Sequence, residues 1–218
     1  YIVAGDEMQG RNTGEPGQKK AGEYLISEYK KMGISFPLGA TDFYQKVPSE
    51  FMKKGFAPKL NDSENIWAFI KGSEKPDEVL VISAHYDHVG MKNGEIYNGA
   101  DDDGSGTVAL LEIAQAFKEA EKKGHGPKRS ILFLHVTGEE HGLHGSRYYS
   151  ENPLFPLKNT VADINIDMIG RRDTLHPGTN NYIYVIGSDR LSSELHTINE
   201  EANTKYTQLE LDYKYNDR

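Results

Sequence analysis

The sequence predicts an α/β protein, a three-layer αβα sandwich around a mixed, mainly parallel sheet. Three observations lead to this fold class. Short apolar runs alternate along the chain with longer segments of helical periodicity. Two of the runs, residues 79–84 and 131–136, are almost continuously apolar, as expected for strands covered by helices on both faces. Acidic residues and histidines follow directly after three of the runs, at the strand ends where open α/β sheets bind their ligands.

Three helices are predicted from apolar residues that recur every three or four positions. The first spans residues 17–32, with Pro16 near its start and Gly33 just past its end. The second spans residues 105–123, and its apolar side chains cover more than one face, which indicates a buried helix. The third spans residues 190–202.

Five short β-rich runs are predicted to form strands, and one longer segment is predicted to be irregular. Residues 36–61 are rich in Pro, Gly and Lys and show weak periodicity, so we expect loops there and not a separate domain. We find no internal repeat, and a length of 218 residues suits a single domain over 1–218. The predicted strands are residues 65–70, 79–84, 131–136, 161–166 and 182–186.

The composition excludes several classes of function. The chain has 25 basic and 33 acidic residues, and it lacks a dense Lys/Arg cluster, so nucleic acid is not an expected partner. The absence of cysteine excludes disulfides, thiolate zinc sites and cysteine nucleophiles. No apolar run approaches the roughly 20 residues that cross a bilayer, so we expect no membrane span. The sequence selects no oligomeric state.

A histidine and an acid follow the run at 79–84. His85 and Asp87 are two residues apart, so in an extended chain their side chains point to the same side. A metal-bound imidazole usually gives its other ring N–H to a carboxylate, and this pair can supply both parts. A structural, hydrogen-bonded histidine explains the pair equally well.

Three consecutive acids, Asp101, Asp102 and Asp103, precede the predicted buried helix. They repel one another unless something positive lies among them. One of them can cap the helix, whose N-terminus favours an anion, and a second can bind a metal ion. The spacing does not choose between them, and a solvated acidic loop is the alternative.

Acids also follow two further apolar runs, residues 131–136 and 161–166. Glu139 and Glu140 come just after residues 131–136, where two carboxylates are costly unless they are paired or bound to a metal. One of the pair can bind a metal ion while the other accepts a proton from water. Asp167 follows residues 161–166, where a lone acid is more often a cap or turn former. Together, the four clusters favour a metal site.

At these residues the sequence resembles the bacterial leucyl aminopeptidase / aminopeptidase Y family. This is a family of co-catalytic di-zinc exopeptidases related to glutamate carboxypeptidase II, so the resemblance implies a zinc-exopeptidase-like fold. Residues 6–14 also look like the start of the catalytic domain of that family. The motifs that carry the resemblance are His85-x-Asp87, Gly-Ala-Asp-Asp-Asp-Gly-Ser-Gly at 99–106, Glu139-Glu140 and Asn-Ile-Asp-Met-Ile-Gly at 165–170.

The resemblance implies a zinc-dependent aminopeptidase that hydrolyses N-terminal residues from a peptide substrate. Two Zn²⁺ ions would activate a water molecule, and a glutamate would act as general base. The implied roles are zinc ligands for His85, Asp102, Glu140 and Asp167, general base for Glu139, and partner of the His85 ring for Asp87. In this pattern His85 and Asp167 serve one ion, Glu140 serves the other, and Asp102 bridges both.

The chain departs from the family pattern at its end. The family completes its second zinc site with a distant downstream histidine, but the chain stops at Arg218. We therefore expect a catalytic domain that lacks its C-terminal part and a second site that lacks a histidine, so that this chain binds the second ion weakly. His176 and His196 do not stand in the matching context, and we expect both to be surface or packing residues. Because the family is often exported, the resemblance implies a periplasmic or secreted location.

Two other functions remain open. A glutaminyl-cyclase-like acyltransferase shares the fold but uses one zinc ion, and the pair His85 and Asp167 argues against it because that pair serves the additional ion. A non-catalytic binding module of the same fold is expected to have lost its ligands or its base. Here both glutamates and every upstream ligand are present.

Overall fold

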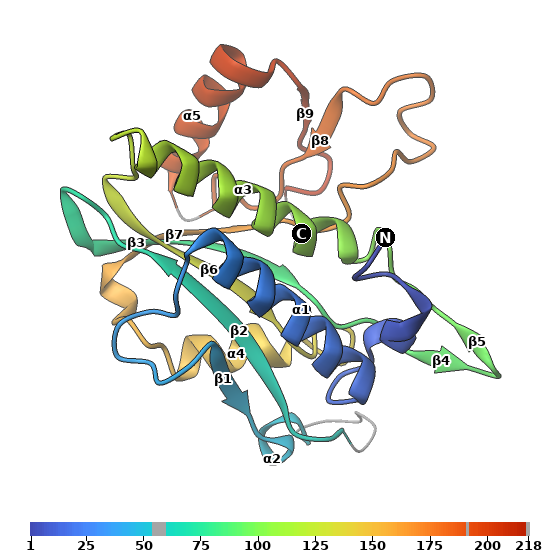
Figure 1. The fold of residues 1–218 in the computed structure, drawn as a ribbon. Coiled ribbons are helices and arrows are strands. Elements are labelled where there is room, and N and C mark those ends of the chain that lie inside the picture. Colours follow the sequence, from blue (N-terminus) through green and yellow to red (C-terminus); the bar gives the residue numbers. More distant parts are fainter. Residues whose placement is uncertain (54–59, 191, 217–218) are drawn as a thin grey trace. The chain divides into compact units, whose positions relative to one another are not determined.

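The computed structural model describes residues 1–53, 60–190 and 192–216 (Figure 1). The chain divides into two compact units, Tyr1–Gly170 and Arg171–Arg218. Each unit is described by itself.

The first unit is built on a five-stranded sheet with the order β1-β2-β6-β3-β7. Strand β3 pairs in parallel with both β6 and β7, whereas β2 pairs antiparallel with β1 and β6. The carboxyl ends of β6, β3 and β7 therefore meet at one edge of the sheet. The strands are β1 (Tyr44–Val47), β2 (Ser63–Ile70), β3 (Lys75–His85), β6 (Arg129–Val136) and β7 (Thr160–Asn165).

Helices cover both faces of this sheet, which confirms the three-layer prediction. Helices α1 (Pro16–Met32) and α3 (Gly104–Lys122) lie on one face, and α4 (His144–Glu151) lies on the other (Figure 1). Ile82 of β3 packs in the cluster formed with α1 and α3, whereas its neighbour Val81 packs in the cluster that contains Tyr149 of α4. Successive side chains of a strand point to opposite faces. The almost continuous apolar runs of β3 and β6 are therefore explained by burial on both sides.

The prediction for residues 36–61 is wrong in part, because β1 and a short helix, α2 (Ser49–Met52), lie there. Strand β1 has four residues and pairs with β2, with Tyr44 opposite Ile66. Four residues are too few to show a clear period, and the strand is stabilised by hydrogen bonds to a distant partner. Residues 54–59 of the predicted segment lie outside the described part of the chain.

Shorter elements surround the sheet in the first unit. They are the 3-10 helices η1 (Asp6–Arg11) and η2 (Leu157–Asn159) and the hairpin of β4 (Met91–Lys92) with β5 (Glu95–Ile96).

Among the described residues, no helix is long and apolar enough to span a membrane.

The second unit contains the last predicted strand and helix. Strand β8 (Tyr182–Tyr184) pairs in parallel with β9 (Glu210–Asp212), and α5 (Ser193–Ala202) continues into a π-helical turn at Asn203–Thr207. His176 is buried, with its ring stacked on that of Tyr182 at 3.7 Å between centroids. His196 Nδ1 lies 2.8 Å from Ser188 Oγ. Both histidines thus make local packing or hydrogen-bond contacts, as predicted.

A buried histidine in the sheet makes stability depend on pH. His135 of β6 is fully buried, its Nε2 lies 2.8 Å from the Tyr29 hydroxyl, and burial lowers its pKa to about 3. The ordinary histidine pKa is near 6.5, so between about pH 6.5 and 3 the unfolded chain holds the extra proton. Stability should therefore fall with falling pH in this window, at up to about 1.4 kcal/mol per pH unit.

This prediction can be checked by urea unfolding between pH 7 and 4. The variant His135→Gln keeps a polar side chain but cannot take up the proton, so we expect its free energy of unfolding to fall less steeply with acidification than that of the wild type. Equal slopes for the two proteins would contradict the role of His135.

Candidate metal centre

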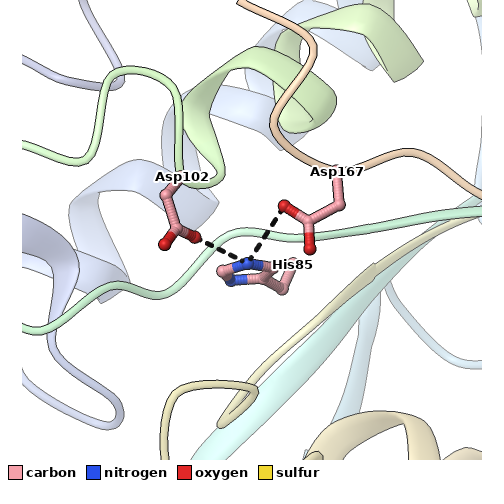
Figure 2. A group of neighbouring side chains, drawn as sticks. All are labelled: His85, Asp102 and Asp167. Carbon is pink, nitrogen blue, oxygen red and sulfur yellow. Dashed lines mark ion pairs between the residues drawn. The ribbon is translucent and has the colours of Figure 1, made fainter. Parts of the chain in front are cut away.

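Most of the predicted site residues lie at, or just after, the carboxyl ends of the three parallel strands β3, β6 and β7. His85 is the last residue of β3 and is 3% exposed. Its Nε2 lies 3.1 Å from Asp102 Oδ1 and 3.8 Å from Asp167 Oδ1. Figure 2 shows the Asp102 and Asp167 carboxylates both pointing toward the same imidazole nitrogen of His85. Glu139 belongs to the same group, with Oε2 at 4.0 Å from His85 Nε2.

A second cluster lies beside the first and shares Asp102 with it. It consists of His88, Asp102 and Glu140, each with one ligand atom within 4.8 Å of the others. His88 Nδ1 lies 2.5 Å from Glu140 Oε1. Glu140 was predicted from the sequence as a metal ligand, whereas His88 was not. The position of His88 in the sequence was the signal that could have identified it. His88 directly follows Asp87, just beyond the strand end that carries the ligand candidate His85.

The three consecutive acids have three different roles. Asp103 caps helix α3, where its Oδ1 accepts a hydrogen bond from Gly106 N at 2.8 Å. Asp101 Oδ1 accepts from Gly170 N at 2.7 Å and so anchors the segment after Asp167. Asp102 is the member that faces both histidine clusters. The expected division between a capping acid and an acid in the cluster is therefore present.

Asp87 links the strand end to its surroundings. Its buried carboxylate accepts hydrogen bonds from Thr13 Oγ1 at 2.7 Å and from Glu139 N at 3.2 Å. His85 Nδ1 lies 3.7 Å from the Asp87 carboxylate and 3.1 Å from its main-chain oxygen. Asp87 therefore lies beside the His85 ring, and its carboxylate also fixes the backbone of Glu139.

Arg11 is a structural residue of the site that sequence reasoning missed. Its side chain is fully buried and donates hydrogen bonds to four main-chain carbonyl groups. Two of these, at Asn98 and Gly99, lie in the loop that leads to the three acids, and another is at Tyr86, next to His85. Arg11 thereby holds the acidic loop against the end of β3. Its only sequence signal is its place in the opening segment at 6–14.

Burial and mutual repulsion shift the ionisation of these groups. Burial is the largest cause that raises the pKa of Glu139, and the Asp87 and Glu140 carboxylates raise it further, whereas His85 lowers it. Burial alone would lower the pKa of His85, but its hydrogen bonding to Asp87 and the charges of the neighbouring carboxylates raise it to about 10. Burial and the charge of Asp167 raise the pKa of Asp103 to about 7. The site therefore holds an excess of negative charge that favours a cation.

The donor set fits a metal ion such as zinc. Imidazole and carboxylate groups without thiolates are suitable zinc ligands. In addition, His88 Nδ1 and Glu140 Oε1 are buried and lie 2.5 Å from each other, so an imidazole and a carboxylate converge in the second cluster.

A cavity of about 400 Å³ adjoins the first cluster. His85, Glu139 and Asp167 contribute to its wall, and so do polar side chains from β3 and β7. Its volume lies within the range of small-molecule sites. Its apolar lining residues are Val81, Leu134, Val136, Leu143 and Leu157.

Comparison with known sequences places the chain in a family. The model of "Peptidase family M28" matches residues 65–217. A probable zinc metalloprotease of Pyrenophora teres f. teres is 30% identical over 173 residues, which cover 73% of this chain and 32% of the relative. An aminopeptidase of Mus musculus is 38% identical over 112 residues, which cover 50% of this chain and 14% of the relative. The chain thus spans about a third or less of the length of these two relatives.

Solved structures confirm the fold. A zinc aminopeptidase from Bacillus subtilis superimposes with a TM-score of 0.71 at 16% identity and covers 97% of this chain and 77% of its own. A glutaminyl cyclase from Porphyromonas gingivalis superimposes with a TM-score of 0.69 at 19% identity and covers 96% of this chain and 70% of its own. At such identities the likeness shows the fold alone, and the same fold serves both named activities.

The resemblance inferred from the four motifs is therefore confirmed at the level of the whole family, and the narrower placement among the leucyl aminopeptidases stays a prediction. The family match covers more than half of the chain and includes every metal-ligand candidate from His85 to Asp167. This chain belongs to peptidase family M28.

Proposed function

We propose that the protein is a zinc-dependent exopeptidase that removes N-terminal residues from peptides. The observation that carries this proposal is the position of Glu139. Its carboxylate is 34% exposed, contributes to the wall of the cavity, and lies 4.0 Å from the imidazole of the first cluster. A carboxylate beside a metal-ligand cluster and open to a cavity is the arrangement that hydrolysis of a bound peptide requires.

Two groups of side chains would hold zinc. His85, Asp102 and Asp167 would bind one ion, and Asp102 and Glu140 would contribute to a second. When bound, zinc polarises a carbonyl group and increases the acidity of water. The adjoining cavity would receive the end of a peptide, with its apolar wall against a side chain.

Glu139 would act as general base and then as general acid. Its raised pKa brings it closer to neutral pH, where a carboxylate is a more effective proton acceptor. An Oε atom would take a proton from the attacking water and later return it to the nitrogen of the departing amine. The hydrogen bond from Glu139 N to Asp87 fixes the backbone of this residue, so Asp87 would keep the base in place.

Two assays on the same preparation test this function. We expect the protein to hydrolyse aminoacyl-anilides, to lose that activity when a chelator removes its metal, and to regain it with added Zn²⁺. We expect no cyclisation of a peptide with N-terminal glutamine. Cyclisation without anilide hydrolysis would favour an acyltransferase, and the absence of both activities from a zinc-loaded protein would favour a binding module.

A further inference from the structure

We propose that Asn65 of β2 is a positioning residue that holds the loop carrying Glu139 and Glu140. This glutamate loop, residues 137–145, connects the end of β6 to the first turn of α4. Asn65 acts on the backbone of the loop and not on either carboxylate. Its effect on catalysis rests on the proposed function, in which Glu139 is the general base, whereas its effect on the loop itself does not.

The side chain of Asn65 is hydrogen-bonded to both ends of the glutamate loop. Asn65 is fully buried, and its Oδ1 atom accepts a hydrogen bond from Thr137 N at 3.0 Å. Its Nδ2 atom donates to Gly145 O at 2.9 Å and to Gln45 Oε1 at 2.9 Å. The amide therefore uses its acceptor and both of its donors, and two of the three bonds reach the loop. A buried polar group with all its partners in place makes its surroundings rigid.

The two ends of the loop are also bonded to each other and to the rest of the fold. Gly145 N donates a hydrogen bond to Thr137 O at 2.7 Å. Thr137 Oγ1 accepts a hydrogen bond from Gln18 Nε2 of α1 at 2.6 Å, and it lies 2.6 Å from Ser63 Oγ of β2. All of these side chains are buried. Helix α1, strand β2 and the glutamate loop thus meet in one buried polar network.

The contact between Asn65 and the loop leaves no space for a larger residue at position 145. A Cβ atom added to Gly145 would overlap Asn65 Oδ1 and the main-chain nitrogen and oxygen atoms of Thr137. Residue 145 lies in the first turn of α4, where alanine would normally be the better helix former. The close approach to Asn65, and not helix propensity, therefore accounts for glycine at this position.

Hydrogen bonds inside the loop connect its ends to Glu139. His144 N donates to Gly138 O at 3.0 Å. Gly142 N donates to Glu139 O at 2.9 Å, and Glu139 N donates to the Asp87 carboxylate at 3.2 Å. Because the loop is a small, internally bonded unit, a shift of its ends displaces Glu139 relative to Asp87. A displacement of about 1 Å in a reacting group can lower a rate by about 100-fold.

The variant Asn65→Asp tests the proposal, and Gln45→Met is its matched control. The aspartate keeps the size of the side chain but places an acceptor against Gly145 O, where the amide has a donor. The methionine removes the bond between Gln45 and Asn65 from the other side and leaves both bonds to the loop in place. Gly145→Ala disturbs the same contact from the loop, so it provides a second variant if Asn65→Asp does not fold.

Two measurements are made on each folded variant. Amide hydrogen exchange of the metal-free protein, followed by mass spectrometry, reports the protection of residues 138–145, with residues 79–84 of β3 as the internal reference. Steady-state hydrolysis of an aminoacyl-anilide at saturating Zn²⁺ gives kcat and KM. A role in overall stability alone would lower protection throughout the sheet and leave kcat unchanged at temperatures where the variant is folded.

For Asn65→Asp and Gly145→Ala we expect roughly tenfold faster exchange in the glutamate loop alone and a kcat about 100-fold lower, with KM nearly unchanged. For Gln45→Met we expect the loop exchange and the kcat of the wild type. Wild-type exchange in the loop of Asn65→Asp would overturn the proposal, and so would a kcat as high as that of Gln45→Met. If the wild type hydrolyses no anilide, the proposed function fails, and the exchange data alone decide whether Asn65 holds the loop.

Discussion

Replacing Glu139 with glutamine is expected to lower kcat by at least three orders of magnitude while the zinc content remains that of the wild type. The amide keeps the size of the side chain but cannot accept a proton from water. A loss of a thousandfold corresponds to about 4 kcal/mol of activation free energy, which is within the range of general-base catalysis combined with correct positioning. The measurement is steady-state hydrolysis of an aminoacyl-anilide together with elemental analysis of zinc.

Glu140→Gln is the matched control for this prediction. The two glutamates are adjacent, and the structure places Glu140 with His88 and Asp102. We therefore expect Glu140→Gln to lose bound zinc, in contrast to Glu139→Gln. A Glu139→Gln protein with wild-type turnover would contradict the assignment of the base, and one that loses its zinc would show that Glu139 is instead a ligand.

Replacing Asp102 with alanine is expected to remove zinc from both sites and to abolish activity. Among the described residues, two clusters of side chains can hold a metal ion. Asp102 is the only residue that belongs to both. Its loss removes one ligand from each site and leaves the other carboxylates in mutual repulsion. The expected result is less than half an ion per chain at a zinc concentration that fills the wild type, measured by elemental analysis after desalting.

Asp101→Asn provides the comparison within the same three-acid run. The Asp101 side-chain oxygen accepts a hydrogen bond from Gly170 N, and an asparagine oxygen can accept the same bond. We therefore expect this variant to retain both zinc ions. If Asp101→Asn and Asp102→Ala lose zinc to the same extent, the assignment of Asp102 as the shared ligand is wrong.

Much of this site could be predicted because its chemistry lies at strand ends. His85 ends one strand and Asp167 follows another, and both strands are recognisable as apolar runs. Parallel strands bring such ends to one edge of a sheet. The rest depended on contacts between distant residues. Spacing could not show which of three adjacent acids caps α3, because that is decided by the turn at the start of the helix. The position of His88 beside Glu140 depends on how two strands are aligned, and the local sequence does not record this alignment.

The fold shows the same limit. Strand β1 is held by its pairing with β2, so its four residues carry little signal of their own. Arg11 lies 75 residues from Tyr86 and 88 residues from Gly99, both of which it contacts through their carbonyl oxygens. Every residue has a main-chain carbonyl group. The residue types of the partners of Arg11 therefore do not indicate that a buried arginine contacts them.

A crystal structure of the zinc-loaded protein, with anomalous scattering recorded at the zinc absorption edge, tests whether His85, Asp102 and Asp167 hold a zinc ion. We predict an anomalous peak about 2.0–2.1 Å from His85 Nε2, with Asp102 and Asp167 as further ligands. A zinc-loaded crystal without a peak at His85, or with its zinc held only by residues outside the two clusters, would show that these side chains do not form the metal centre.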